Sequence, residues 1–309
     1  MNAFPARSFS LAVAGLVAAA TLAGCSTDTD PVADDPAPGG STSAPPTSEA
    51  PTTEPSEPAS SSEPPAPAET VVAPVYFTGD SPMGVRLFRE FRAVEADNPL
   101  AEAAALMLAG DALDPDYGTL YSGSGFAAVS YDEQGARFVV ELADDSLTTA
   151  PAGLSKADAR VAVQALVYTL QGVQQVRAPL VVTLDGSPTT LLGLDTSDGV
   201  KNASQLDVLS LVNVTSPEQG ATVSGAFTAS GVASSFEATV PWQVRQGDTV
   251  VLDGFATAEG FMDKLYPWET EIDVSGLAPG GYTFVALTDD PSGGEGPGPY
   301  VDTKAITVQ

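Results

Sequence analysis

The sequence predicts an α+β domain followed by an all-β sandwich, both preceded by a long N-terminal segment without a core of its own. Between residues 71 and 206, strand patterns are mixed with two helical patterns, which is typical of α+β layers. From residue 207 to 309, helical periodicity is absent and short strands recur between turn signals, which is typical of a sandwich.

The composition excludes several classes of protein. The chain has 309 residues, with 12 Lys and Arg against 40 Asp and Glu, no His and one Cys. Without His there is no His-based catalytic site, and a single Cys excludes a disulfide framework or a zinc site built from cysteines. A net charge of −28 argues against nucleic acid as a partner, because phosphate binding needs a basic surface. We expect no cofactor and no metal.

Residues 1–24 have the features of a bacterial signal peptide. The apolar run Leu11–Leu22 is too short to span a bilayer and has the length of a signal-peptide core. It leads into Leu22-Ala23-Gly24-Cys25, which resembles the lipobox of bacterial lipoproteins. The resemblance implies a diacylglycerol on Cys25 that anchors the chain to the extracytoplasmic face of the cell membrane. The alternative is an ordinary secretory signal with a chance cysteine.

Residues 25–70 are predicted to be a disordered linker. Residues 26–70 hold 11 of the 26 Pro and nine acidic residues but no Lys or Arg. Such a segment cannot bury enough apolar surface to offset its conformational entropy, and proline and charge repulsion both stiffen it. We expect a spacer that holds the folded domains away from the membrane.

Two helices and five strands are predicted in the α+β domain. A helix over residues 98–110 is indicated by Asn98 as the N-cap and by Pro99 at the first helical position. A second helix, Lys156–Leu170, follows the capping residue Ser155. The strands are predicted at Val71–Phe77, Gly84–Val94, Phe126–Ser130, Ala136–Leu142 and Gln175–Leu184.

This domain resembles the GerMN domain, which is named for spore-germination proteins and also occurs in envelope lipoproteins. The similarity lies in an ordered series of pieces: Tyr76-Phe77, Leu87…Glu90-x-Arg92-x-Val94, Pro99-Leu100, Val167-Tyr168-Thr169-Leu170, Gly172-Val173-x-x-Val176 and Leu184-Asp185-Gly186. Members often have Leu-Thr where this chain has Leu170-Gln171, and residues 111–125 do not align. The resemblance implies no established enzymatic activity and therefore no catalytic residues.

Three arginines fall within seven residues of the second predicted strand: Arg86, Arg89 and Arg92. Strand alternation puts Arg86 and Arg92 on one face and Arg89 on the other. Ion pairs with the many carboxylates of the chain are one interpretation. The other is an anion-binding patch for a wall carboxylate, a phosphate or an acidic partner.

Seven strands are predicted in the sandwich domain. Trp242 and Trp268 alternate with polar residues, so both are expected on core faces and not on a sugar-binding surface. The turn before Tyr282 looks like a tyrosine corner, in which the hydroxyl bonds back to the backbone. The strands are predicted at Val208–Val214, Phe227–Val232, Ala238–Arg245, Thr249–Thr257, Trp268–Val274, Tyr282–Thr288 and Val301–Val308.

The second domain resembles the immunoglobulin-like domain of bacterial spore-germination proteins, which often follows GerMN in one chain. The similarity is carried by Ser216-Pro217-x-x-Gly220-x-x-Val223-Ser224-Gly225, Ser230-Gly231-x-Ala233…Phe236-Glu237-Ala238-Thr239-Val240 and Asp289-x-x-Ser292. This resemblance likewise implies an immunoglobulin-like fold without an established enzymatic activity.

Two further features of the second domain invite a functional interpretation. Phe261, Met262 and Tyr266 cluster in the loop before Trp268, where they either close the loop on the sandwich or form a partner-docking loop. Tyr300 and Lys304 have the spacing of a dehydrogenase Tyr/Lys pair. No Gly-rich cofactor loop precedes a helix, so we interpret that spacing as chance.

These observations favour a non-enzymatic, lipid-anchored protein of the bacterial envelope that binds or positions a partner. The expected partner is an envelope protein or a cell-wall polymer, and the expected membrane contact is the lipid on Cys25. The alternative is a carboxylate-dependent cell-wall hydrolase, since 40 acidic residues always offer pairs. A spacer without a partner is the third hypothesis.

Overall fold

Two long strands open the fold, as the pattern near residue 71 predicts. In the computed structural model, which describes residues 69–290 and 294–309, β1 (Thr70–Gly79) and β2 (Arg86–Glu95) pair antiparallel over their whole length. The short strand β3 (Tyr117–Gly118) pairs with the other edge of β1. The signal peptide, Cys25 and all but the end of the predicted linker lie outside the described residues.

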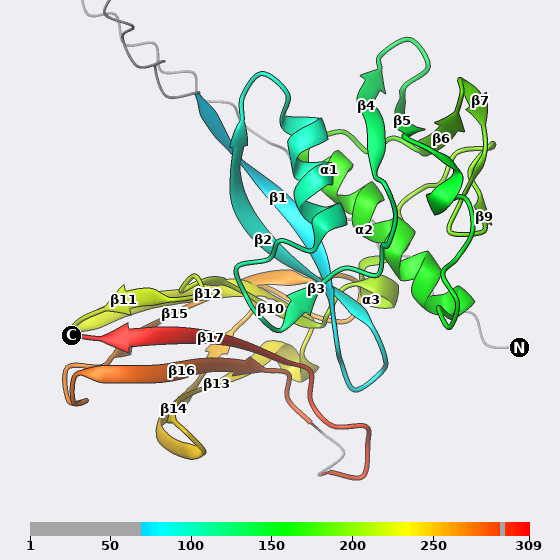
Figure 1. The fold of residues 1–309 in the computed structure, drawn as a ribbon. Coiled ribbons are helices and arrows are strands. Elements are labelled where there is room, and N and C mark those ends of the chain that lie inside the picture. Colours follow the sequence, from blue (N-terminus) through cyan, green and yellow to red (C-terminus); the bar gives the residue numbers. More distant parts are fainter. Residues whose placement is uncertain (1–68, 291–293) are drawn as a thin grey trace, which may run out of the picture. The chain divides into compact units, whose positions relative to one another are not determined.

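Two helices fill the interior of the first domain. In Figure 1, α1 (Pro99–Ala109) and α2 (Lys156–Gln174) lie between the β1–β2 pair and a second sheet. Every residue of α2 from Val161 to Leu170 is buried, as expected for a helix with a layer on either side. The predicted cap of α2 is confirmed, because the Ser155 hydroxyl accepts a hydrogen bond from the Asp158 amide at 3.0 Å. Asn98 precedes α1 without a side-chain cap bond.

The second helix runs four residues beyond its predicted end at Leu170. Gly172 does not stop it, because this glycine serves a close approach to β1: a Cβ at Gly172 would lie 2.5 Å from Cγ of Pro74. The helix ends at Gln174, and the next residue, Gln175, has a left-handed φ of 56°. The prediction of a strand from Gln175 is therefore wrong at its start, and the strand begins at Leu180.

The second sheet confirms the α+β class. Its order is β4-β5-β6-β7, and β5 and β6 run parallel because α2 makes the crossover between them. A two-stranded hairpin of β8 and β9 follows. The strands are β4 (Phe126–Asp132), β5 (Arg137–Leu142), β6 (Leu180–Leu184), β7 (Ser187–Pro188), β8 (Thr190–Leu191) and β9 (Leu194–Asp195).

The second domain is a β-sandwich, as predicted, with its core between two sheets. One sheet has the order β10-β12-β15 and the other β11-β17-β16-β13-β14. The strand β11, which the sequence did not predict, pairs parallel with β17. The strands are β10 (Val212–Ser216), β11 (Ala221–Val223), β12 (Ala226–Ala233), β13 (Thr239–Gln246), β14 (Thr249–Thr257), β15 (Tyr266–Asp273), β16 (Gly280–Leu287) and β17 (Val301–Val308).

The segment that joins the domains differs from its prediction. Instead of a strand from Val208, the chain forms a short helix, α3 (Gln205–Val208), and β10 starts only at Val212. Val208 and Leu209 pack into the core of the first domain. The strand pattern failed here because these apolar residues face the first domain and not the sandwich.

Three side chains of the sandwich behave as predicted. The Tyr282 hydroxyl donates to the carbonyl oxygen of Ala278 at 2.8 Å, which confirms the tyrosine corner. Trp268 is buried in the core, and Trp242 is half-buried against it. Neither indole forms an exposed platform for a sugar.

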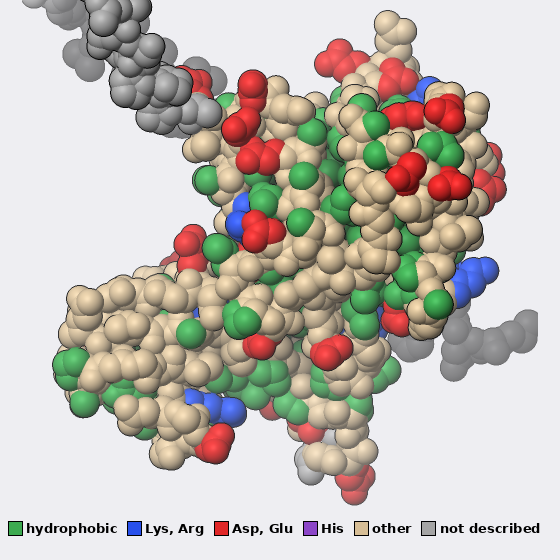
Figure 2. Space-filling view, viewed as in Figure 1, with side chains coloured by type: hydrophobic (Ala, Val, Ile, Leu, Met, Phe, Trp, Pro, Cys, Tyr) green, Lys and Arg blue, Asp and Glu red, His purple; other side chains and the backbone are tan. Residues whose placement is uncertain are grey.

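The described surface is acidic. Figure 2 shows acidic side chains spread over the face in view, with few basic ones among them. This agrees with the excess of 40 acidic over 12 basic residues. Among the described residues, no helix combines the length and the apolar character needed to cross a membrane.

Candidate functional site

The three arginines of β2 do not gather into one patch. Arg86 donates to the backbone carbonyl of Asp207 in α3. Arg92 turns to the loop after α1, where it donates to the carbonyl of Asp111 and lies 3.4 Å from the carboxylate of Glu90. Both side chains are therefore occupied by contacts within the chain. Of the three arginines of the predicted patch, only Arg89 remains as a candidate for binding an anion.

Arg89 reaches from the first domain to the second. Its guanidinium donates to the Thr215 hydroxyl on β10 at 3.2 Å and lies 4.6 Å from the centre of the Phe91 ring. Its Nε is buried and has no hydrogen-bond partner among the described residues. No carboxylate in the described part of the chain pairs with it, in contrast to Arg92, Arg137 and Lys304. A half-buried cation without a counter-ion is unusual in an acidic protein.

A buried ionic cluster joins the two domains beside Arg89. Lys304 on β17 donates to Asp114 at 2.6 Å, to the Tyr117 hydroxyl at 2.6 Å and to Asp302 at 3.2 Å. The Tyr117 hydroxyl in turn donates to Asp302 at 2.5 Å. The three charged side chains are each at most 5% exposed. Since Asp114 and Tyr117 belong to the first domain, the cluster holds the domains together through fully desolvated charges.

The second carboxylate oxygen of Asp302 is bound within the sandwich. It accepts hydrogen bonds from the Asn213 side-chain amide at 3.0 Å and from the Val214 backbone amide at 2.6 Å. Burial raises the pKa of Asp302, and the nearby charge of Lys304 opposes this shift. Burial also raises the pKa of Tyr117 well above its ordinary value, and the negative charge of Asp302 adds to the effect. Tyr117 therefore stays a neutral donor at any physiological pH.

Sequence reasoning missed this cluster, although β17 carried a signal for it. Along β17, the buried positions alternate, and two of them are the charged residues Asp302 and Lys304. Two charges on the core face of a strand need partners from elsewhere. Those partners lie in residues 111–125, the segment that did not align with the GerMN pattern. Tyr300 and Lys304 thus do not form a catalytic pair, because Lys304 is ion-paired with two carboxylates.

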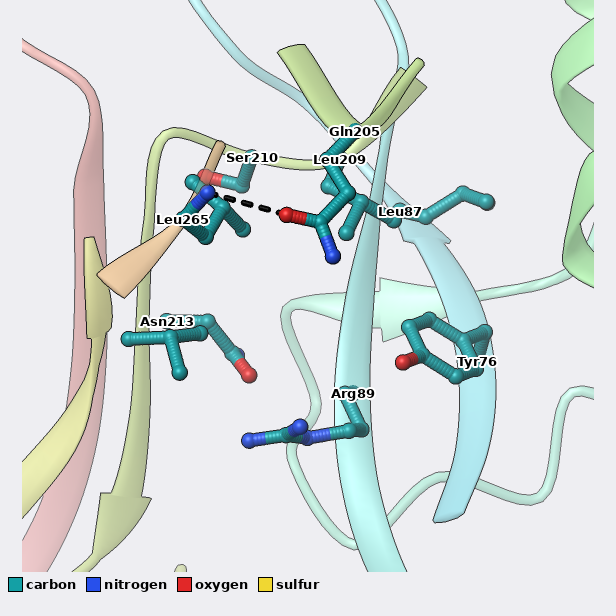
Figure 3. Close-up of a pocket in the computed structure, with 9 residues that line it drawn as sticks. Tyr76, Leu87, Arg89, Gln205, Leu209, Ser210, Asn213 and Leu265 are labelled. Carbon is teal, nitrogen blue, oxygen red and sulfur yellow. Dashed lines mark hydrogen bonds between the residues drawn. The ribbon is translucent and has the colours of Figure 1, made fainter. Parts of the chain in front are cut away.

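Arg89 lines three cavities, two of which are also lined by residues of the sandwich. The smaller of these two, of about 60 Å³, lies among β1, β2, the α3 segment and the sandwich. The larger, of about 250 Å³, is lined by Arg89, Phe91, Leu113, Thr215 and Lys304, among others. Figure 3 shows the Tyr76 hydroxyl, the Gln205 amide and the Arg89 guanidinium arranged around the smaller space. Burial raises the pKa of Tyr76, so that its hydroxyl also stays protonated.

The three residues of the predicted docking loop differ in their surroundings, since Met262 is exposed and the other two contact neighbouring side chains. Met262 is 73% exposed, whereas Phe261 packs edge-on against Phe236 with ring centres 6.4 Å apart. The Tyr266 hydroxyl donates to Asp263 within the same loop at 2.8 Å. The residue before Tyr266, Leu265, donates its amide hydrogen to the side-chain oxygen of Gln205 at 2.9 Å and lines the smaller cavity. The loop thus contacts the first domain of its own chain.

The site offers binding groups but no recognisable catalytic set. It provides the Arg89 guanidinium, which pairs with no carboxylate of the described residues, together with several hydroxyls and amides. Its carboxylates are those of Asp114, Asp302 and Glu90, which are paired, and that of the exposed Glu218, which lines the larger cavity. No group of three or more carboxylates or thiols within the described ranges is arranged to hold a metal ion.

Comparison with known families agrees with both resemblances drawn from the sequence. Residues 74–190 match the family profile described as "Sporulation and spore germination", the Germane or GerMN domain. Residues 211–295 match the profile described as "Immunoglobulin-like domain of bacterial spore germination", or Gmad2. The chain therefore carries a GerMN domain followed by a germination-type immunoglobulin-like domain. Neither is a known catalytic family.

Solved structures share only distant similarity with this chain. Tandem GerMN domains of GerM from Bacillus subtilis match with 12% identity and a TM-score of 0.34, over 67% of this chain and 62% of that one. Fibronectin(III)-like modules of Clostridium thermocellum CbhA match with 19% identity and a TM-score of 0.22, over 31% and 93%. An engineered protein matches with 16% identity and a TM-score of 0.26, over 50% of this chain and 36% of its own length. Comparison with curated proteins found no match.

Proposed function

We propose that this protein is a lipid-anchored, non-enzymatic binding module of the bacterial envelope. In this proposal, the lipid on Cys25 holds the chain at the extracytoplasmic face of the cell membrane. The linker carries the two domains away from the membrane. The domains together bind an envelope protein or a cell-wall polymer.

The junction of the two domains supports a binding role most directly. The Lys304 cluster joins the domains through buried charges, so that Arg89 and its cavities have fixed walls from both sides. A preformed cavity with convergent polar groups is the usual form of a binding site. The absence of His and the pairing of the junction carboxylates Asp114 and Asp302 disfavour acid–base chemistry there.

Capture from a bacterial envelope extract tests the binding role. The full-length protein is immobilised and its bound components are compared with those of Arg89→Gln and of Arg160→Gln, an exposed arginine on α2 that lines neither cavity. We expect loss of the captured component with Arg89→Gln and normal capture with Arg160→Gln. Release of sugar or peptide fragments from purified wall, abolished by one carboxylate substitution, would favour the hydrolase instead.

The lipid anchor is tested separately. Cys25→Ser is expected to move the protein from the membrane fraction to the soluble fraction, because the sulfur that carries the lipid is gone. Mass spectrometry of the wild-type N-terminus should find an acylated cysteine. An unacylated N-terminus would contradict the anchor without touching the binding role.

A further inference from the structure

The smaller cavity concentrates unsatisfied polar atoms. Six side-chain nitrogen or oxygen atoms in the described part of the chain are buried without a hydrogen-bond partner. Three of them line this one cavity: Nε of Arg89, Oγ of Ser210 and Oδ1 of Asn213. Ser210 and Asn213 are only 1% and 3% exposed. Because buried polar groups are nearly always satisfied in native proteins, this concentration indicates a place built for a polar ligand.

The charge balance of the cavity favours an anion. Arg89 brings a positive charge that no carboxylate of the described residues neutralises. Its contacts, the Thr215 hydroxyl and the Phe91 ring, are uncharged. A ligand carboxylate would supply the counter-charge and accept hydrogen bonds from a planar guanidinium, which suits that geometry.

The other polar groups that line the smaller cavity indicate which hydrogen bonds a ligand could form there. The amide oxygen of Gln205 already accepts a hydrogen bond from Leu265, so its amide nitrogen is left to donate, and Figure 3 shows it on the cavity side. The Ser210 and Tyr76 hydroxyls can donate to the same anion. Asn213 differs, because its Nδ2 is bound to Asp302 and its free Oδ1 can only accept. The site thus offers several donors for a carboxylate and one acceptor for an N–H beside it.

The size limits the ligand to an end group. A cavity of about 60 Å³ suits a small group, such as one carboxylate and the atoms next to it. A carboxylate followed by an N–H is the end of a peptide. We infer that the cavity at Arg89, Ser210 and Asn213 binds the C-terminal carboxylate of a peptide, which defines the partner chemistry of the binding role proposed above.

Calorimetric titration of the full-length protein tests this inference with matched small molecules. N-acetylglycine carries both the carboxylate and the N–H, acetate lacks the N–H, and N-acetylglycinamide lacks the carboxylate. We expect N-acetylglycine to bind at millimolar concentrations, acetate more weakly, and N-acetylglycinamide not at all. N-acetyl-L-alanine and N-acetyl-D-alanine then distinguish the source, since protein C-termini are L and wall peptides end in D residues.

Two variants and one control locate the binding. Arg89→Gln should weaken N-acetylglycine binding at least about tenfold, because a charge-assisted contact is lost. Ser210→Ala should weaken binding while thermal stability stays unchanged, because the Ser210 hydroxyl has no partner in the described residues to lose. Arg160→Gln should bind like the wild type.

Two outcomes would overturn the inference. One is the absence of N-acetylglycine binding to a wild-type protein that is folded by its thermal transition. The other is binding that Arg89→Gln and Ser210→Ala leave unchanged. If envelope capture still depends on Arg89 while N-acetylglycine fails to bind, the binding role stands and only the peptide C-terminus is wrong.

Discussion

The ammonium group of Lys304, on the last strand of the chain, lies 2.6 Å from the carboxylate of Asp114, 190 residues earlier. Each of these side chains is at most 5% exposed, so neither is stabilised by water. The pair couples a GerMN domain to an immunoglobulin-like domain. The walls of the cavities at Arg89 depend on this coupling, because both domains contribute to them.

Removing the cation of this cluster should destabilise the protein severely. Lys304→Met leaves Asp114 and Asp302 buried without their counter-charge, and the loss of one partner of a buried ion pair costs about 3–5 kcal/mol. Urea denaturation measures this cost. The matched control is Lys201→Met, which removes an exposed lysine and should change the free energy of unfolding by less than about 0.5 kcal/mol. Equal effects of the two substitutions would show that the cluster is not desolvated.

Alkaline pH should destabilise the fold through buried tyrosines. Burial raises the pKa of Tyr76, Tyr117 and Tyr121 in the folded protein above the ordinary value of 10.0. Above about pH 10 the unfolded chain therefore loses these protons first, and stability that is complete below that pH is lost as pH rises. Each such tyrosine contributes up to about 1.4 kcal/mol per pH unit.

Denaturation with urea at pH 8 and pH 11 checks this dependence. Tyr117→Phe should reduce the difference in unfolding free energy between the two pH values, because one coupled proton is removed. Tyr131→Phe, which changes a partly exposed tyrosine of β4, is the control. If the difference in unfolding free energy between pH 8 and pH 11 is as large in Tyr117→Phe as in Tyr131→Phe, the result contradicts the burial of the Tyr117 hydroxyl.

The cap of α2 should have a measurable effect on stability. Ser155→Ala removes the oxygen that accepts from the Asp158 amide, at a cost of about 1 kcal/mol. Ser204 provides a control, because it precedes α3 without a side-chain cap bond. Thermal or urea denaturation should therefore detect Ser155→Ala and find Ser204→Ala nearly neutral. The reverse order would contradict the capping geometry.

The contact between α2 and β1 should not tolerate a methyl group. Gly172→Ala places a Cβ 2.5 Å from Pro74, so helix and strand must move apart, at a cost of about 1–3 kcal/mol. Gly276→Ala meets no atom within 4 Å and serves as the control. If Gly172→Ala unfolds at the same urea concentration as the wild type, the close approach is wrong.

Local patterns in the sequence were enough for most of the fold. Ser155 and the apolar positions that follow it define α2, and the turn before Tyr282 defines its corner, because in each case the cause lies within a few residues. The end of α2 and the start of β10 were wrong for a different reason. At Gly172 and Val208 the backbone conformation depends on contacts with distant segments of the chain, which a local sequence pattern does not contain.

The candidate site was only partly predictable. Arg89 stood out because cations are rare in this chain, but the sequence left open whether the three arginines form a patch or make ion pairs. In the structure Arg86 binds a backbone carbonyl, and Arg92 binds a carbonyl and pairs with carboxylates. Ser210 and Asn213 carried no signal, since an ordinary polar residue becomes notable only when its burial is known. The Lys304 cluster joins residues 114 and 304, and only the folded chain shows that they meet.

Photo-crosslinking in living cells tests the central claim, that the domain junction is a partner-binding site. A photoreactive residue replaces Leu113, which is 52% exposed and lines the larger cavity, and in a second strain it replaces Phe255, which is 67% exposed on β14 and lines neither cavity. The account predicts a discrete adduct with an envelope component from position 113 and none from position 255. No adduct from position 113, or the same adducts from both positions, would contradict it.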